Sequence, residues 1–290
     1  MVGVIDMKPY KLLEYKYKRY VGADYAVSCN TGTSALHLAL MAIGITKGDE
    51  VIMPDFTMVA CGFAVSYCGA KPVFVDCDKT LCIDWKLIEK KITKRTKAIM
   101  AVHIYGRLCN MKEILRIAKK HKLKVIEDGC EGQGAIWQSK ADITCYSFYE
   151  NKIIHAEEGG ICTTDNKTYA KRMEYLKNMA FGDKHDYFHK EIGYNYRMPN
   201  SQALLALDSL AGIKEELKRR RLFEQQADEV IKSTMPKRDV VWVYDFLGEP
   251  PVGYDTRPFF KPLSSMPMWG GKCQSPMAKW YSERGNYIRL

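Results

Sequence analysis

The sequence predicts an α/β protein whose large domain has a mostly parallel central sheet flanked by helices, followed by a reduced C-terminal small domain. Short apolar runs alternate with longer helical patterns from about Tyr20 to Thr164, which is typical of a parallel sheet covered by helices. The 290 residues suffice for one large domain and a smaller one. Beyond Met235, seven prolines crowd a segment with few periodic runs, which indicates a separate region.

Each element follows from its residue pattern. Short buried-looking apolar runs predict strands at Glu50–Pro54, Lys71–Asp76, Lys97–Val102, Lys124–Asp128, Ile143–Phe148 and Ile161–Thr164. Helical periodicity predicts helices at Ala35–Ile43, Met58–Cys68, Asp84–Ile92, Met111–His121, Asn166–Met179 and Ser201–Ala227. Asp84 is expected to be the N-cap of its helix. Ligands of such sheets bind at the carboxyl ends of the strands, so the residues that follow each strand are the candidates for function.

Composition and charge exclude several classes of protein. The chain is 47% apolar and 27% charged, close to the average of globular proteins, which argues against a disordered or collagen-like chain. The net charge of +10 is compatible with an anionic ligand. The densest basic run, Lys214–Arg221, contains both basic and acidic residues at helical spacing, which is typical of a solvent-exposed helix face. No nucleic-acid-binding motif is present, so we expect no nucleic-acid partner.

The cysteines and the apolar runs indicate the compartment. Ten cysteines occur without any C-x-x-C pair, which favours reduced thiols over disulfides or a structural zinc site. The longest apolar stretches, such as Ala98–Tyr105, fall far short of the roughly 20 residues of a membrane-spanning helix. The first 20 residues lack the apolar region of a signal peptide. We therefore expect a cytoplasmic protein without membrane association.

Three segments hold residues suited to chemistry. The hydroxyl-rich turn Asn30–Ser34 enters a helix, where backbone N–H groups favour an anion such as phosphate, although an ordinary N-cap has the same pattern. Asp128 ends an apolar strand and can either hold a protonated heterocycle nitrogen or a metal, or cap the next element. Lys152 follows a strand and precedes Gly159-Gly160. Desolvated lysines form Schiff bases with carbonyl compounds, but most lysines only provide surface charge.

Taken in order, these segments resemble the DegT/DnrJ/StrS sugar aminotransferases, a family of fold-type I pyridoxal-phosphate enzymes. The resemblance runs from about Tyr20 to Leu210. Its markers are the turn Thr31–Leu36, the segments Gly48–Thr57, Lys71–Asp76 and Val102–Gly106, the pair Glu127-Asp128, and the segments Ser147–Lys152, Glu158–Gly160 and Gly193–Arg197.

The resemblance implies a role for each site residue. Lys152 would bind pyridoxal 5'-phosphate as a Schiff base and move the proton during catalysis, and Asp128 would pair with the pyridine nitrogen. Further cofactor contacts would come from Gly32, Thr33, Ser34 and Ser147 at the phosphate, and from Met58, Glu131 and Asn195. Met58 stands where the family commonly has an aromatic residue over the pyridine ring. Asn195 would reach the partner's phosphate, which implies a homodimer with shared active sites.

The same resemblance implies the substrates and the domain limits. The enzyme would transfer the amino group of L-glutamate to a nucleotide-linked 4-keto-6-deoxy sugar for amino-sugar and glycan biosynthesis. Glu131 resembles the members that act on GDP-4-keto-6-deoxymannose, the perosamine synthases. Residues 1–210 would form the cofactor-binding large domain, with a truncated N-terminal segment at 1–19, and residues 211–290 a linking helix and a shortened small domain. Because of these short ends, a catalytically impaired or regulatory relative is the alternative.

Overall fold

The central sheet contains the six strands that the sequence predicts and one that it does not, Tyr25–Cys29, and the strand order determines where a ligand can bind. The computed structural model describes residues 7–182 and 187–290. Within these ranges the larger sheet has seven strands in the order β1-β7-β6-β5-β4-β2-β3. Its strands are β1 (Tyr25–Cys29), β2 (Glu50–Pro54), β3 (Lys71–Val75), β4 (Thr96–Val102), β5 (Lys124–Asp128), β6 (Ile143–Ser147) and β7 (Gly160–Thr164). All run in the same direction except β7, which is antiparallel to both neighbours. The mostly parallel sheet is confirmed.

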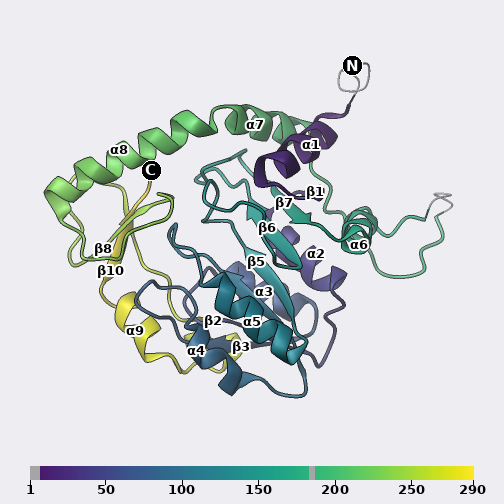
Figure 1. The fold of residues 1–290 in the computed structure, drawn as a ribbon, viewed down its shortest axis with the longest axis horizontal. Coiled ribbons are helices and arrows are strands. Elements are labelled where there is room, and N and C mark those ends of the chain that lie inside the picture. The colour runs from purple at the N-terminus through teal and green to yellow at the C-terminus, as the bar shows by residue number, and fades with distance from the viewer. Residues whose placement is uncertain (1–6, 183–186) are drawn as a thin grey trace.

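Helices pack on both faces of this sheet (Figure 1). The helices of the described residues are α1 (Pro9–Val21), α2 (Gly32–Ala42), α3 (Val59–Tyr67), α4 (Trp85–Ile88), α5 (Met111–His121), α6 (Lys167–Lys177), α7 (Asn200–Ala211), α8 (Ile213–Ile231) and α9 (Pro276–Ser282), of which α8 lies against the second sheet described below. Short 3₁₀ turns occupy Glu89–Lys91, Leu263–Ser265 and Pro267–Trp269. Strands β2, β4, β5 and β6 are almost wholly buried between these layers, as expected for parallel strands that are covered on both faces. None of the described helices combines the length and the apolar character needed to cross a bilayer.

Two predicted helices differ from the structure. The single helix predicted over Ser201–Ala227 is two helices, α7 and α8, joined at Gly212, whose N–H bonds the Asp208 carbonyl and ends α7. Glycine is a poor residue for a helix interior, so the chain breaks there. The helix predicted over Asp84–Ile92 is α-helical only to Ile88 and then tightens into a 3₁₀ turn, as short helices often do at their ends. Asp84 is the N-cap, because its side chain accepts from the N–H of Lys86.

The C-terminal region holds a second, three-stranded antiparallel sheet. Its strands, in the order β8-β10-β9, are β8 (Tyr244–Leu247), β9 (Thr256–Pro258) and β10 (Gly285–Ile288). The long helix α8 runs along this small sheet, and the chain ends beside it (Figure 1). A small apolar cluster of Ala227, Tyr244, Phe246 and Ile288 joins the helix to the sheet.

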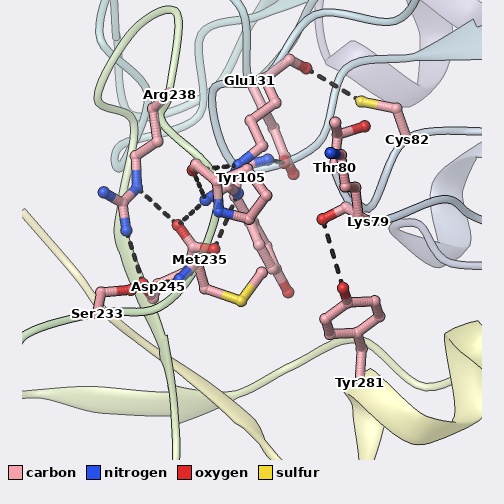
Figure 2. Close-up of polar contacts among 12 residues, drawn as sticks. Lys79, Thr80, Cys82, Tyr105, Glu131, Ser233, Met235, Arg238, Asp245 and Tyr281 are labelled. Atoms are coloured by element: carbon pink, nitrogen blue, oxygen red, sulfur yellow. Dashed lines mark hydrogen bonds and ion pairs between the residues drawn. The ribbon is translucent and has the colours of Figure 1, made fainter.

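A buried charge cluster anchors the C-terminal region to the loop after β4. Asp245 is fully buried and lies 2.8 Å from Arg107 Nη1 and 2.6 Å from Arg238 Nε. Arg238 also pairs with Glu224 of α8 at 2.8 Å. Figure 2 shows the Arg238 guanidinium directed at Asp245. The cluster therefore connects three parts of the chain that are distant in sequence.

We expect Asp245→Asn to lower the free energy of unfolding by about 3–5 kcal/mol, because it leaves two buried guanidinium groups short of a counter-charge. Urea unfolding followed by circular dichroism measures this change. The matched control is Asp255→Asn, which removes an exposed carboxylate that pairs with Arg289 and should cost about 1 kcal/mol or less. Equal losses in the two variants would contradict the anchoring role of the cluster.

Candidate active site

A cavity of about 420 Å³ opens at the carboxyl ends of β4, β5 and β6, beside the first turn of α2. This is the sheet edge at which ligands of α/β proteins bind. Its volume lies within the range of small-molecule and cofactor sites. Its polar lining includes Thr31, Gly32, Thr33, Thr57, Asp128, Glu131, Ser147, Asn151, Lys152 and Glu158.

The first turn of α2 forms an anion site on the cavity wall. Thr31 is the N-cap, and its Oγ1 accepts from the N–H of Ser34 at 3.0 Å. A Cβ on Gly32 would come within 2.7 Å of Ser147 Cβ, so only glycine lets the helix lie this close to the end of β6. The first intrahelical bond runs from the Ala35 N–H to the Thr31 carbonyl, so the N–H groups of Gly32 and Thr33 precede the helical ladder, and the helix dipole favours negative charge at this end. The turn can therefore hold a phosphate beside Thr33 and Ser147.

Asp128 presents a carboxylate at the end of β5. Its side chain is 5% exposed. Oδ1 accepts from the Cys130 N–H at 3.0 Å, and Oδ2 accepts from the Cys61 thiol at 3.2 Å. A thiol is a weak donor, so Oδ2 retains most of its capacity for a stronger cationic partner. A protonated ring nitrogen is a partner of that kind.

Lys152 lies on the loop that follows β6, and Gln133 holds this loop in place. The Gln133 amide nitrogen donates to the carbonyls of Ser147 and Ile154, and its oxygen accepts from the Ile154 N–H at 2.9 Å. The Lys152 side chain is 12% exposed, and its Nζ lies 4.0 Å from Glu131 Oε1. The lysine amine therefore faces the cavity from a loop that Gln133 holds at residues before and after Lys152.

Glu131 is a buried acid that faces Lys152. Its Oε2 accepts from the N–H of Tyr105 at 2.8 Å, and Figure 2 shows the two residues together. Burial raises the pKa of Glu131 to about 8, although Lys152 opposes this shift. The carboxyl group is therefore mostly protonated at neutral pH and can donate a hydrogen bond into the cavity.

We expect Glu131→Gln to gain stability relative to the wild type as the pH rises. The raised pKa of Glu131 means that its contribution to the fold is complete below the ordinary carboxyl pKa of about 4.5 and is lost as the pH rises through about 8. Glutamine does not titrate, so the difference in unfolding free energy should shift in favour of the variant by about 3 kcal/mol between pH 5 and pH 8. Urea unfolding of the ligand-free proteins measures it.

The control for this experiment is Glu229→Gln on the exposed side of α8. Its difference from the wild type should stay nearly constant over the same pH range. A Glu131→Gln difference that is equally constant would show that Glu131 ionises as an exposed glutamate does.

The structure brings most of the predicted site residues together. Gly32, Thr33, Met58, Asp128, Glu131, Ser147 and Lys152 all line the cavity. Ser34 is buried behind the wall, where its hydroxyl pairs with Thr31 Oγ1 at 2.9 Å. Asn195 lines a neighbouring cavity of about 800 Å³, and Thr31 and Glu158 line both cavities. The roles assigned to these residues remain predictions.

Other cavity residues were not identified from the sequence. Cys61 and Trp242 line the cavity, while Gln133 supports the Lys152 loop from behind. Cys61 falls on a predicted helix of small residues, and Trp242 stands far from the motifs in the C-terminal region. Gln133 could have been identified from its position five residues after Asp128, in the turn that follows the predicted strand.

Comparisons with known proteins identify the family of this chain. The model of the DegT/DnrJ/EryC1/StrS aminotransferase family matches residues 5–241. The chain is 39% identical to the GDP-perosamine synthase of Caulobacter vibrioides, over 88% of this chain and 76% of that protein. It is 36% identical to the GDP-perosamine synthase of Escherichia coli O157:H7, over 94% and 82%. The crystal structure of NtdA from Bacillus subtilis with bound cofactor PMP superposes with a TM-score of 0.90 at 27% identity, covering 98% of this chain and 73% of that chain. The chain therefore belongs to the DegT/DnrJ/EryC1/StrS aminotransferase family.

Proposed function

We propose that this protein is a pyridoxal-phosphate-dependent aminotransferase that moves the amino group of L-glutamate to a nucleotide-linked 4-keto-6-deoxy sugar. The observation that carries the proposal is the convergence of three groups on one cavity: the amine of Lys152, the carboxylate of Asp128 and the first turn of α2. GDP-4-keto-6-deoxymannose is the favoured acceptor, supported by the likeness to two GDP-perosamine synthases.

The residues present fit this cofactor. The first turn of α2, with Gly32 pressed against Ser147, suits its phosphate, and Asp128 suits its pyridine nitrogen. Met58, which is half exposed at the cavity, suits one face of the ring through its thioether. When bound, pyridoxal phosphate supplies an electron sink for the charge that develops at the carbon losing its proton.

The chain's own residues then account for binding and proton transfer. Lys152 Nζ would hold the cofactor covalently in the resting enzyme, and its free amine would accept the α-proton of glutamate. Asp128 would stabilise a protonated ring nitrogen through its carboxylate. Glu131 would donate a hydrogen bond from its carboxyl group to a molecule bound in the cavity. The cofactor would retain the amino group while water releases 2-oxoglutarate, and the amino group would then pass to the keto carbon of the sugar.

Two single-turnover measurements test the proposal. Glutamate should bleach the yellow holoenzyme, and a keto-sugar should restore the colour, with the GDP-linked sugar reacting faster than dTDP- and UDP-linked ones. Recovery with simple 2-oxo acids and with none of the nucleotide sugars would reject the sugar acceptor while leaving the cofactor assignment in place. A protein that stays colourless with excess cofactor would reject the whole proposal.

We also propose a homodimer with shared active sites. Asn195 lines the cavity next to the Lys152 cavity, and Thr31 and Glu158 line both. Mixing Lys152→Ala with Asn195→Ala chains should restore activity above either parent, because exchange creates one site with both residues intact. Mass photometry identifies the dimer. A monomer at the assay concentration, or no recovery after proven exchange, would defeat the proposal.

The domain limits and the cellular location are also part of the proposal. The division into residues 1–210 and 211–290 is supported by the second sheet and its small apolar cluster, although residues 1–6 of the predicted N-terminal segment lie outside the described residues. A cytoplasmic location is supported by the ten cysteines, which are all free thiols.

A further inference from the structure

Trp242 is a residue of the C-terminal region whose ring contacts the amine of Lys152. It lies two residues before β8, is 3% exposed and lines the same cavity as Asp128 and Lys152. Its ring centroid is 3.8 Å from Lys152 Nζ. An amino group at this distance lies directly on the aromatic face, where the ring attracts a positive charge.

A hydrogen bond fixes the orientation of this ring. The indole Nε1 donates to the carbonyl of Asn151 at 2.9 Å, so the ring is tied to the residue that precedes Lys152. Tyr105 stacks on the indole with ring centroids 6.1 Å apart, and Tyr287 packs beside it at 6.3 Å. The indole therefore has little freedom to turn away from the lysine.

The backbone around Trp242 is held equally firmly. Arg220 of α8 donates to the Trp242 carbonyl at 2.5 Å. The Gly106 carbonyl accepts from the N–H groups of Asp239 and Val240, both at 3.0 Å. Gly106 has a φ of +80°, and a Cβ there would lie 1.8 Å from the Val240 carbonyl oxygen, so the close approach requires glycine. The C-terminal region thus presents Trp242 to the cavity from a rigid support.

We propose that Trp242 is a positioning residue for Lys152, whose free amino group it holds on its indole face at the cavity wall. The carboxyl group of Glu131, 4.0 Å from the same amine, is mostly protonated at neutral pH because burial raises its pKa to about 8. The π face, 3.8 Å from Nζ, thus lies as close to the amine as this carboxyl group does. The part of the proposal that concerns turnover rests on the proposed function: after glutamate displaces Lys152, the indole keeps the amine within reach of the proton it must move.

The direct test uses ligand-free protein and does not depend on catalysis. Trace acetylation with isotopically labelled acetic anhydride, followed by peptide mass spectrometry, gives the reactivity of Lys152 relative to the exposed Lys171 in the same sample. Trp242→Leu removes the π face, so the relative reactivity of Lys152 should rise about three- to tenfold. Trp242→Phe retains an aromatic face and should stay within about twofold of the wild type.

The controls separate positioning from folding. Trp280→Leu changes a partly exposed indole outside the cavity and should leave Lys152 at wild-type reactivity. Near-ultraviolet circular dichroism checks that each variant is folded, and Trp242→Met replaces the leucine variant if that one is not. Wild-type reactivity in the leucine or methionine variant, or equal acceleration in the phenylalanine variant, overturns the proposal.

A kinetic measurement tests the part that concerns turnover. In the half-reaction with glutamate, Trp242→Leu should lower kcat about tenfold with little change in KM, because the amine is misplaced while the donor still binds. A change in KM alone would overturn the positioning role. If the wild type binds no cofactor, the proposed function fails, while the acetylation result still decides whether Trp242 holds Lys152.

Discussion

Lys152→Ala should lose transamination by about 10⁴-fold or more while still binding the cofactor. The first turn of α2 and Asp128 remain in the variant, so phosphate and ring contacts are retained. The described lining holds no other lysine, so no comparable amine is left to relay the proton. The measurement is the single-turnover rate of cofactor bleaching by glutamate, with bound cofactor quantified after denaturation.

Two further variants separate the causes of this loss. Lys152→Arg keeps a positive charge but forms no Schiff base, so it should be as inactive as Lys152→Ala. The exposed Lys171→Ala on α6 should behave as the wild type does. A Lys152→Ala rate within tenfold of the wild type would show that another group moves the proton.

Asp128→Asn should slow the exchange of the glutamate α-proton by about 10²- to 10³-fold. Asparagine has nearly the same shape, and its carbonyl oxygen can still accept from the Cys130 N–H. It is neutral, however, and cannot hold a protonated ring nitrogen, so the electron sink is weakened. Exchange with deuterated water, followed by NMR of the glutamate, measures the rate.

Cofactor content distinguishes this electronic effect from simple loss of binding. The variant should retain bound cofactor, with a changed absorption spectrum. The exposed Asp255→Asn serves as the matched control and should exchange at the wild-type rate. Near-normal exchange in Asp128→Asn would refute the role of the carboxylate.

The sequence predicts six of the seven strands of the large sheet because each is a distinct apolar run, whereas β1 and helix α1 were not predicted. Lys124–Asp128 and Met111–His121 have the predicted bounds, since each combines a strong pattern with clear ends. The Gly212 break was missed because α7 and α8 both have helical periodicity and only this one residue separates them. Periodicity alone does not tell one long helix from two in succession.

Some residues of the site could likewise be predicted from the sequence, and others could not. Gly32, Asp128 and Lys152 could be placed from the sequence because each follows a strand or begins a helix, and parallel strands bring such positions to one edge. Trp242 could not, because its contact with the Lys152 loop spans 91 residues and depends on the tertiary support from Gly106 and Arg220. The Cys61 thiol was missed for the same reason, since its bond to Asp128 joins α3 to β5.

The most direct measurement of the central claim is the location of the covalent cofactor. The holoenzyme is reduced with borohydride and digested, and the pyridoxyl group is mapped by mass spectrometry, with Lys152→Ala treated in parallel. We expect the label on Lys152 of the wild type and no labelled peptide from the variant. A pyridoxyl group on another lysine, or none despite bound cofactor, would contradict the assignment of Lys152 and the active site built around it.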